Sequence, residues 1–439
     1  MTEASSSAPL QALLDLADRL DADGVGGVPE AWASVKLGLL AIGLPVVAGT
    51  LGVTAARATR AIRERIERWP GELAALEVGA AGVAARPASG RLVITSDLHR
   101  APPGGADVPA AQGTVAIYEA MLEHYAADHW VLVENGDVED FWISGGSAYG
   151  VAYEWAKARA GRRWSSADVY REHLARTIAN YPGIYGRIEE GFHRDGRYVR
   201  LFGNHDDVLE DPAVAAGLHD AHPDLEVHEH LVLRDGAAGA ERTVAVVTHG
   251  HQVDSWNAAD LAALGRFGTW FGSTVADAPF SESHPGMPPP EATRAMLSGR
   301  QPNVLTRVSP VLGANRDLYS LDEVWLADAF RAAYPSGDDP WLILGHTHLP
   351  VHAARLPGTD DRWDRYINGG CGVHHQMVTA IEWDGTVVGA DPVVQLVAWF
   401  DAAAVPDTPD DALVTSHAGR RIARRVLAPS EDGSVLVPV

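Results

Sequence analysis

Short β-branched runs that end in polar turns recur through the middle of the chain. The runs are RLVITSD (91–97), HWVLVENGD (129–137), RYVRLFGNHD (197–206), TVAVVTHG (243–250) and WLILGHTH (341–348). An apolar run of this length is typical of a strand buried on both faces. Helical stretches between the first runs predict an α/β chain, in which functional side chains gather at the carboxyl ends of strands.

The rest of the chain divides around these runs. Helical spacing of apolar residues covers 8–22 and 54–78, and the Gly/Ala/Pro-rich stretch 79–90 predicts a linker. Further predictions are a helical insertion at 142–196, an insertion at 252–340, strands at 365–368, 376–383 and 386–399, and a helix near 411–427. The expected organisation is an N-terminal helical module (1–86), a main domain (87–400) that contains the insertion 252–340, and a C-terminal extension (401–439).

Residues 37–56 form an uncharged run of 20, which is the length of a bilayer span. The arginines that follow it would then place the rest of the chain in the cytoplasm. The alternative is a Gly/Ala-rich helical hairpin, broken near Pro45, that packs on the protein. Both interpretations predict a cytoplasmic main domain, with or without association with the cytoplasmic face of a membrane.

Composition excludes several classes of protein. The chain has 439 residues and a formal net charge of −23, which opposes a general duplex-DNA binder. Its single cysteine, Cys371, excludes an internal disulfide and a cysteine-based zinc finger. A small phosphorylated substrate held by metal ions remains compatible with this charge.

Candidate chemistry lies in the five polar turns. They are Asp97-Leu98-His99, Gly136-Asp137-Val138-Glu139-Asp140, Gly203-Asn204-His205-Asp206, His249-Gly250-His251 and Gly345-His346-Thr347-His348. Carboxylate, amide and imidazole groups suit hard and borderline divalent cations. Residues i and i+2 of an extended segment project to the same side, so both ends of a DxH or HxH triplet can reach one cleft. The glycines permit tight turns and close backbone approach.

This ordered set resembles the calcineurin-like metallophosphoesterase superfamily, whose pattern is DxH, GDxxD, GNH[DE], HG and GHxH. All five blocks occur in order over 91–383. The resemblance implies a four-layer αββα sandwich and a dinuclear metal-dependent phosphoesterase acting on a phosphodiester, phosphomonoester or pyrophosphate. It also implies two divalent ions, with manganese, iron, zinc and cobalt all compatible with the ligands.

The resemblance assigns roles to individual residues. Asp97, His99, Asp137 and His348 would hold the first metal, Asp137 would bridge, and Asn204, His249 and His346 would complete the second. His205 would protonate the leaving oxygen, Asp206 would orient His205, and Asn204 would also touch a phosphate oxygen. The ions would generate hydroxide near neutral pH and neutralise phosphate charge.

A closer similarity is to the UDP-2,3-diacylglucosamine pyrophosphohydrolase-like branch, through GDVEDFWI at 136–143. In that branch the later insertion is a helical lid, so the aromatic stripe at 256–271 is either lid core or an acyl groove. This chain has GNHD where some members of the branch replace the His with Arg, so the lipid substrate is not carried over. The expected partner is a small phosphorylated molecule, lipid- or nucleotide-linked.

Several residues keep two interpretations. Arg100 either contacts phosphate or is a solvated loop arginine, and Asp140 either hydrogen-bonds a ligand or stabilises its turn. His251 is expected beside the metal ligands, and Cys371 is expected to be a small buried residue. The cluster RRIARR (420–425) predicts a solvated helix face or a contact with an anionic membrane. The rival functions are a non-catalytic scaffold and a nuclease, and the net charge opposes the nuclease.

Overall fold

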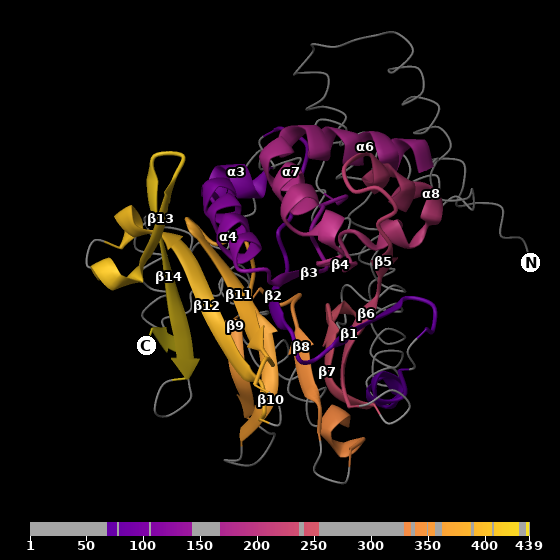
Figure 1. The fold of residues 1–439 in the computed structure, drawn as a ribbon. Helices are drawn as coiled ribbons and strands as arrows, with labels where there is room; N and C mark the ends of the chain where they lie inside the picture. Colours follow the sequence, from indigo (N-terminus) through magenta and orange to yellow (C-terminus); the bar gives the residue numbers. More distant parts are fainter. Residues whose placement is uncertain are drawn as a thin grey trace, which may run out of the picture.

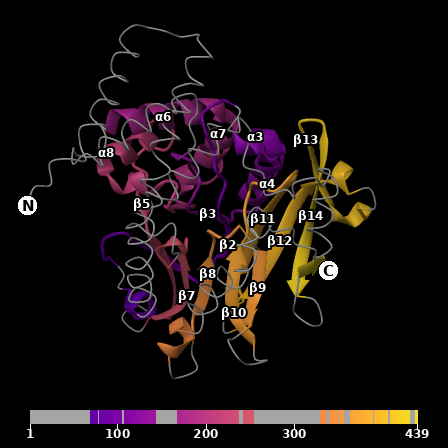
Figure 2. The ribbon, with the colours of Figure 1, turned by 180° about the vertical axis from the view of Figure 1, so that it is seen from behind.

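A computed structural model describes residues 68–142, 167–253, 329–355 and 362–438, with short gaps inside these ranges. Within these residues two mixed β-sheets pack against each other through a shared core, and helices gather at the outer face of one of them (Figures 1 and 2). The C-terminal strands lie at one lateral edge of the molecule, far from the edge formed by β1, β6 and β7 (Figure 1).

The larger sheet has nine strands among the described residues, in the order β13-β14-β12-β11-β2-β3-β4-β5, with β15 paired to β14. Their bounds are β2 Arg91–Thr95, β3 Val131–Asn135, β4 Tyr198–Leu201, β5 Val227–His228, β11 Met377–Asp384, β12 Val393–Asp401, β13 Leu413–His417, β14 Arg420–Pro429 and β15 Leu436–Pro438. Strands β2 to β5 are parallel, so their carboxyl ends share one edge.

The smaller sheet has six strands in the described part of the chain, in the order β1-β6-β7-β8-β10-β9. Their bounds are β1 Val83–Pro87, β6 His230–Asp235, β7 Arg242–Thr248, β8 Trp341–Leu344, β9 Pro350–Arg355 and β10 Arg362–Gly369. Strands β7, β8 and β10 run parallel, whereas β6 and β9 run against their neighbours β7 and β10.

The helices are mostly short and flank the strands. They are α3 Val108–Gln112, α4 Val115–Ala127, α6 Ala167–Asn180, α7 Pro182–Gly191 and α8 Pro212–Ala215. Single turns of 3-10 helix are η1 His193–Asp195, η2 Asp207–Glu210, η3 Ala216–Asp220, η4 His251–Val253, η5 Ala402–Ala404 and η6 Asp410–Ala412. Residues 68–74 and 329–332 are also helical.

Each sheet separates two hydrophobic cores, because successive side chains along a strand point to opposite faces of the sheet. In β2, Val93 packs into the core that the helices cover, whereas Leu92 and Ile94 pack into a second core shared by the two sheets. A third core holds Leu342 of β8 together with Trp69 of the helical residues 68–74. The order of layers is therefore helices, nine-stranded sheet, six-stranded sheet, and helical residues.

The helical character of 167–195 and the predicted strands are confirmed, except that the strand predicted at 386–399 begins only at Val393. Three predictions about the flanks are wrong. The predicted linker 79–90 contains β1, which pairs with β6, so no boundary falls at residue 87. The predicted helix at 411–427 is the hairpin β13–β14, and residues 401–439 contribute strands to the nine-stranded sheet instead of forming an appended extension.

The error at 411–427 has a clear physical cause. Ile422 and Val426 pack toward the helix-covered core, while Ala423 and Leu427 pack toward the core between the sheets. Spacing of i and i+4 fits one face of a helix, but four is also an even number, so it fits one face of a strand. A strand buried on both faces therefore shows two interleaved i, i+4 series that imitate a helix.

The RRIARR cluster consequently lies on β14 and not on a solvated helix. Arg424 pairs with Glu382 of β11, with its Nε 2.7 Å from Oε1, and Arg420 Nη1 donates to the carbonyl of Gly113 at 3.0 Å. The hairpin turn has Ala418 and Gly419 at φ 49° and 77°, the conformation that tight hairpins of type I′ require.

Other predictions fall outside the described residues. These are the helix at 8–22, the run 37–56, the first part of the insertion 142–196, and most of the insertion 252–340 with its aromatic stripe at 256–271. Among the described residues, no helix has both the length and the apolar character needed to cross a bilayer.

Candidate metal centre

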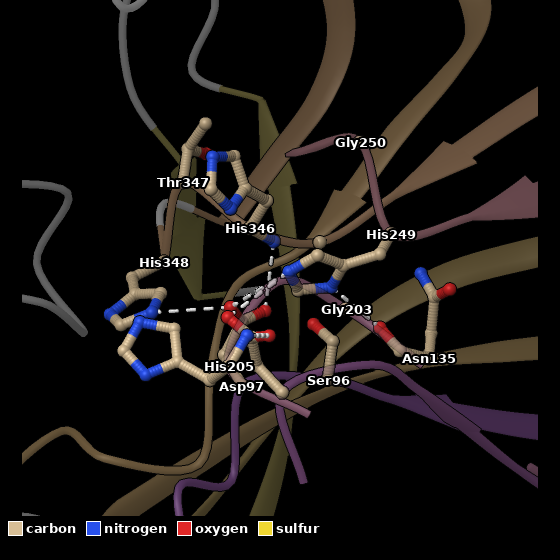
Figure 3. A network of polar contacts seen from close by, with 12 residues as sticks. Ser96, Asp97, Asn135, Gly203, His205, His249, Gly250, His346, Thr347 and His348 are labelled. Carbon is tan, nitrogen blue, oxygen red and sulfur yellow. Dashed lines mark hydrogen bonds and ion pairs between the residues drawn. The ribbon is translucent and has the colours of Figure 1, made fainter. Parts of the chain in front are cut away.

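The polar turns that follow β2, β3, β4, β7 and β8 meet at one site (Figure 3). Three groups of side chains within the described residues have potential ligand atoms that all lie within 4.8 Å of one another. The groups are Asp97–His99–His348, Asp137–His249–His346 and His99–Asp137–His205. Asp137 belongs to the second and third groups and His99 to the first and third, so the groups form one continuous cluster.

The first group is arranged around two facing imidazoles. His99 Nε2 lies 3.1 Å from His348 Nε2, and His348 Nε2 lies 3.2 Å from Asp97 Oδ1. Nitrogens bound to a common ion at about 2.1 Å lie roughly 3 Å apart, so this spacing suits two ligands of one cation. The other nitrogen of His99, Nδ1, contacts Asp140 Oδ2 at 2.9 Å, which directs Nε2 toward His348.

The second group is oriented in the same way. His249 Nδ1 donates to the backbone carbonyl of Asn135 at 2.9 Å, and this bond leaves Nε2 as the nitrogen that faces the carboxylates. His249 Nε2 lies 3.2 Å from Asp137 Oδ2 and 3.9 Å from Asp97 Oδ1. The ring centroids of His249 and His346 are 5.2 Å apart. Figure 3 shows His249 and His348 on opposite sides of the Asp97 carboxylate.

Charge is concentrated in this cluster. Burial disfavours the ionised form of Asp97, but His249 and His348 outweigh burial and lower its pKa to about 2. The same competition lowers the pKa of Asp137 well below its usual value. Burial opposes the charged form of His249 too, yet Asp137 and Asp97 raise its pKa to about 9. A divalent cation bound among these groups would take the place of the histidine proton.

Backbone strain is also concentrated here. Asp97, His99, Asp137, His346 and His348 have φ values of 54°, 48°, 52°, 70° and 59°. They are five of the ten non-glycine residues with positive φ in the described part of the chain. Such conformations cost of order 1–3 kcal/mol each and persist where the surrounding structure imposes them, typically at functional sites.

Two glycines bring the loops together. A Cβ on Gly136, which has φ 80°, would lie 2.6 Å from His249 Nδ1, and a Cβ on Gly203 would lie 2.3 Å from Asp137 Oδ1. Glycine is therefore required at both positions for the loops to approach each other. This confirms the expected role of these glycines.

Asn204 supplies the test of whether a cation fits. It is 1% exposed, and neither its Oδ1 nor its Nδ2 has a hydrogen-bond partner among the described residues. Its neighbour His205 donates a backbone N–H to Asp137 Oδ1 at 2.8 Å, so the Asn204 loop is attached to the bridging candidate. A buried amide without partners carries a desolvation penalty of about 1–3 kcal/mol, which a bound cation would relieve. The carboxylate, amide and imidazole donors suit a borderline divalent metal.

His205 is oriented by Asp140 and not by Asp206. His205 Nδ1 lies 2.9 Å from Asp140 Oδ1, while the other oxygen of Asp140 contacts His99. The Trp142 ring stacks on the His205 ring with centroids 4.0 Å apart. Burial opposes protonation of His205, but Asp140 and Asp137 raise its pKa. In the sequence, the signal for Asp140 is its place at the end of GDVED, and the signal for Trp142 is its place in GDVEDFWI.

Asp206 instead holds the loops in place. Its Oδ1 accepts the backbone N–H groups of Gly203 at 2.6 Å and Asp137 at 3.2 Å, and its Oδ2 accepts that of Val138 at 2.9 Å. Arg200 Nη2 donates to Asp206 Oδ2 at 2.5 Å. The predicted role of Asp206 in orienting His205 is therefore wrong. Its actual contacts fix the backbone that presents Asp137.

Arg100 is neither a phosphate contact nor a solvated arginine. It is 1% exposed and donates to Glu134, and its guanidinium lies 5.2 Å from the ring centroids of Tyr118 and Tyr185. It belongs to a buried charge network that consists of Arg100, Glu134, Glu139, Arg200 and Asp206. Both sequence interpretations of Arg100 are thus replaced by a structural role.

The remaining candidates lie around the cluster. The His251 ring is 5.5 Å from that of His249, and burial with the nearby histidines keeps its pKa well below the usual value. Cys371 is fully buried, as predicted. Asn368, near the end of β10 and three residues before Cys371, donates its Nδ2 to the carbonyl of Gly345 at 2.7 Å, so the end of this strand supports the turn that carries His346 and His348.

A scan against protein-family models and a search of curated proteins each found no match for this chain. The geometry of the site therefore carries the functional argument.

Proposed function

We propose that the chain is a dinuclear metal-dependent phosphoesterase that hydrolyses a phosphodiester, phosphomonoester or pyrophosphate bond of a small phosphorylated substrate. The observation that carries the proposal is the pair of three-residue groups, Asp97–His99–His348 and Asp137–His249–His346, set side by side in one buried cluster. The order of the motifs, which resembles that of calcineurin-like metallophosphoesterases, and the layered α/β architecture both support it. Manganese, iron, zinc and cobalt all suit these donors.

The candidate ligands form one set for each of two cations. Asp97, His99 and His348 would hold one cation, His249, His346 and Asn204 the other, and Asp137 would bridge them. When bound, the two ions would supply hydroxide near neutral pH and stabilise negative charge on phosphorus. Asn204 would also hold a phosphate oxygen, since its amide offers both a donor and an acceptor.

His205 would protonate the leaving oxygen. Its Nδ1 is held by Asp140, which leaves Nε2 as the atom that carries the transferable proton. Stacking on Trp142 fixes the plane of the ring. General-acid assistance of this kind contributes about 10²–10⁴-fold to turnover.

The test is hydrolysis by the full-length protein of p-nitrophenyl phosphate, bis(p-nitrophenyl) phosphate and a UDP-linked pyrophosphate. Each assay is run with Mn²⁺ and with a chelator. We expect chelator-sensitive turnover of at least one ester. His205→Ala should lower kcat by about 10²–10⁴-fold while the bound metal, measured by mass spectrometry, is retained.

His129→Asn provides the matched control. His129 is exposed and has φ 57°, so it shares the backbone conformation of the ligands but not their location, and asparagine tolerates that conformation. Turnover of this variant should equal that of the wild type. Bound metal without hydrolysis of any phosphoester would reject the proposal and favour the non-catalytic scaffold.

A further inference from the structure

A cavity of about 340 Å³ lies next to the candidate metal centre. His251 belongs to both, because it lines the cavity while its ring lies 5.5 Å from that of His249 and 6.4 Å from that of His346. Part of the wall comes from residues 68–76, which precede the motif-bearing part of the chain at 91–383. The five motifs therefore do not define this cavity, whose volume is at the lower end of the range for small-molecule sites.

Charged and uncharged side chains lie at different depths of the lining. The carboxylates and the guanidinium group are exposed or half-buried and form the rim: Arg68, Glu72, Asp207, Glu210 and Glu229. The buried lining residues carry neither kind of group: Trp69, Leu73, Phe202, His230, His251 and Gln252.

Two of the rim carboxylates have ion-pair partners in the lining. Arg68 Nε lies 3.9 Å from Glu72 Oε1. His230 Nε2 lies 3.6 Å from Glu229 Oε1, which also accepts from the Gln252 amide at 3.1 Å. The interior of the cavity therefore favours an uncharged group, because an ion would lose its hydration there.

The apolar part of the wall is rich in aromatic rings. Trp69 and Phe202 are 5% and 9% exposed, and Leu73 is 1% exposed. The Trp69 ring centroid lies 6.4 Å from that of His230, with the two planes tilted by 50°. Rings attract a further ring through offset and edge contacts, beyond the effect of the area that is buried. The wall thus favours an aromatic occupant over an alkyl group.

His251 adds a hydrogen-bonding atom to this wall. The residue is 6% exposed, and its Nδ1 has no hydrogen-bond partner within the part of the chain that the structure describes. A buried imidazole nitrogen of this kind carries a desolvation penalty, which a polar atom of a ligand or an ordered water would relieve. An apolar wall combined with such an atom is typical of a small-molecule site.

His205, the proposed general acid, adjoins the other set of candidate ligands. Its ring centroid lies 4.6 Å from that of His99, and His205 is not part of the cavity lining. The leaving oxygen has to lie within hydrogen-bond reach of His205. A substituent in the cavity is therefore the one that stays on phosphorus. A phosphomonoester has no such substituent, whereas a phosphodiester does.

We propose that the cavity holds an uncharged aryl substituent of a phosphodiester while the phosphate of this substrate lies at the candidate metal centre. The inference rests on the proposed phosphoesterase function and narrows it from three kinds of bond to one. Hydroxide adds to phosphorus, the bond to the other alcohol breaks, and that alcohol leaves with the proton from His205. The products are the free alcohol and an aryl phosphate monoester.

The test compares two diesters that share p-nitrophenolate as the leaving group: phenyl p-nitrophenyl phosphate and methyl p-nitrophenyl phosphate. In the full-length, Mn²⁺-loaded protein, Leu76→Trp should fill the cavity and lower the phenyl-to-methyl ratio of kcat/KM about tenfold, with kcat/KM for the methyl ester unchanged. Trp69→Leu removes one ring of the wall and should lower the ratio in the same direction. Ala75→Trp adds an indole at an exposed position outside the lining and should leave the ratio unchanged.

A second measurement does not depend on turnover. Saturation-transfer NMR with phenol and the chelated protein should give ring signals for the wild type and for Ala75→Trp, and weaker signals for Leu76→Trp. An unchanged ratio in Leu76→Trp, with hydrolysis of both esters, would overturn the cavity assignment and leave the phosphoesterase proposal standing. Weaker phenol signals in Leu76→Trp, without hydrolysis of any ester by the wild type, would support the cavity and reject the phosphoesterase. Equal phenol signals in all three proteins would overturn the cavity assignment directly.

Discussion

The candidate metal cluster and the buried charge network both place carboxylates beside nitrogen-bearing side chains, imidazoles in the first and guanidiniums in the second, but they differ in how those side chains are paired. In the network, Glu134 accepts from Arg100 and from the hydroxyls of Tyr118 and Tyr198, and Glu139 accepts from Arg200 and Tyr185. Only Arg100 Nη1 and Arg200 Nε of the network lack a hydrogen-bond partner among the described residues. In the candidate metal cluster the whole Asn204 amide lacks one, and Asp97 Oδ1 and His249 Nε2 have only ion-pair contacts, the shortest of them at 3.2 Å, with His348 and Asp137.

The backbone follows the same division. Five metal-ligand candidates have positive φ, whereas the five network residues do not. The pairing and backbone of the network are typical of a region that stabilises the fold. The unpaired atoms and positive φ values of the cluster are typical of a binding site, which lowers the stability of the protein without its ligand. Asp206 joins the two regions, because it pairs with Arg200 and accepts the backbone N–H groups that present Asp137. Four substitutions test whether this division is real.

The largest effect is expected for Arg200→Met. Removing one partner of a buried ion pair typically costs about 3–5 kcal/mol, and here Asp206 would remain buried without its cation, while Glu139 would keep only Arg100 at 4.0 Å. The measurement is denaturant unfolding of the chelated protein. Arg194→Met, which breaks an exposed pair with Glu189, should change the free energy of unfolding by less than about 0.5 kcal/mol. Equal effects of the two variants would show that the network does not stabilise the fold.

Asp206→Asn should weaken metal binding more than it weakens the fold. Asparagine keeps one acceptor oxygen, so it cannot satisfy Arg200 and the N–H groups of Gly203, Asp137 and Val138 together. Loss of a group that positions a ligand costs about 10–100-fold in metal affinity. Competition with a fluorescent Mn²⁺ chelator measures this, with the exposed Asp220→Asn as control. An unchanged affinity would mean that Asp206 does not position Asp137.

Gly136→Ala should disturb the cluster specifically. A Cβ there would lie 2.6 Å from His249, and the positive φ adds about 1–2 kcal/mol of strain. Gly196→Ala is the matched control, because Gly196 also has positive φ but no atom within 4 Å of a new Cβ. Both variants should lose similar stability from φ alone, and only Gly136→Ala should lose bound metal, by about tenfold in affinity. Equal metal affinity of the two variants would show that the close approach of Gly136 to His249 is not needed for metal binding.

The two regions also differ in how well the sequence predicts them. That the candidate metal ligands lie close together was predictable, because they come directly after apolar strands, and parallel strands bring such ends together. Its backbone strain was not predictable, since residue type alone does not reveal that Asp97 or His348 adopts positive φ. The charge network was missed because Arg100 and Glu134 are distant in sequence, and a charged residue in an apolar run reads as an exposed one.

The wrong predictions for β1, β14 and Asp206 also arise because contacts with distant parts of the chain decide these structures. β1 was predicted as a linker because VAARP has little β propensity, and its pairing with β6 overrides that preference. β14 imitates a helix because it is buried on both faces. Asp206 was assigned to His205 through the family resemblance, whereas the structure shows that Asp140 reaches His205 from another loop.

Asn204→Leu is expected to change the stability of the chelated protein least of the four substitutions. It therefore contrasts most clearly with Arg200→Met in the network. Leucine is close to asparagine in size and removes a buried amide that has no partner among the described residues. The chelated protein should therefore be as stable as the wild type or more stable by about 1 kcal/mol. The rise in melting temperature on adding Mn²⁺ should shrink, because one ligand of the second cation is lost. Calorimetric scans with chelator and with Mn²⁺ measure both quantities. The opposite result would be a chelated variant that is less stable than the wild type and whose melting temperature rises as much on adding Mn²⁺. That result would make Asn204 a structural residue of the loop. The desolvation penalty of its amide would then be relieved by something other than a metal ion.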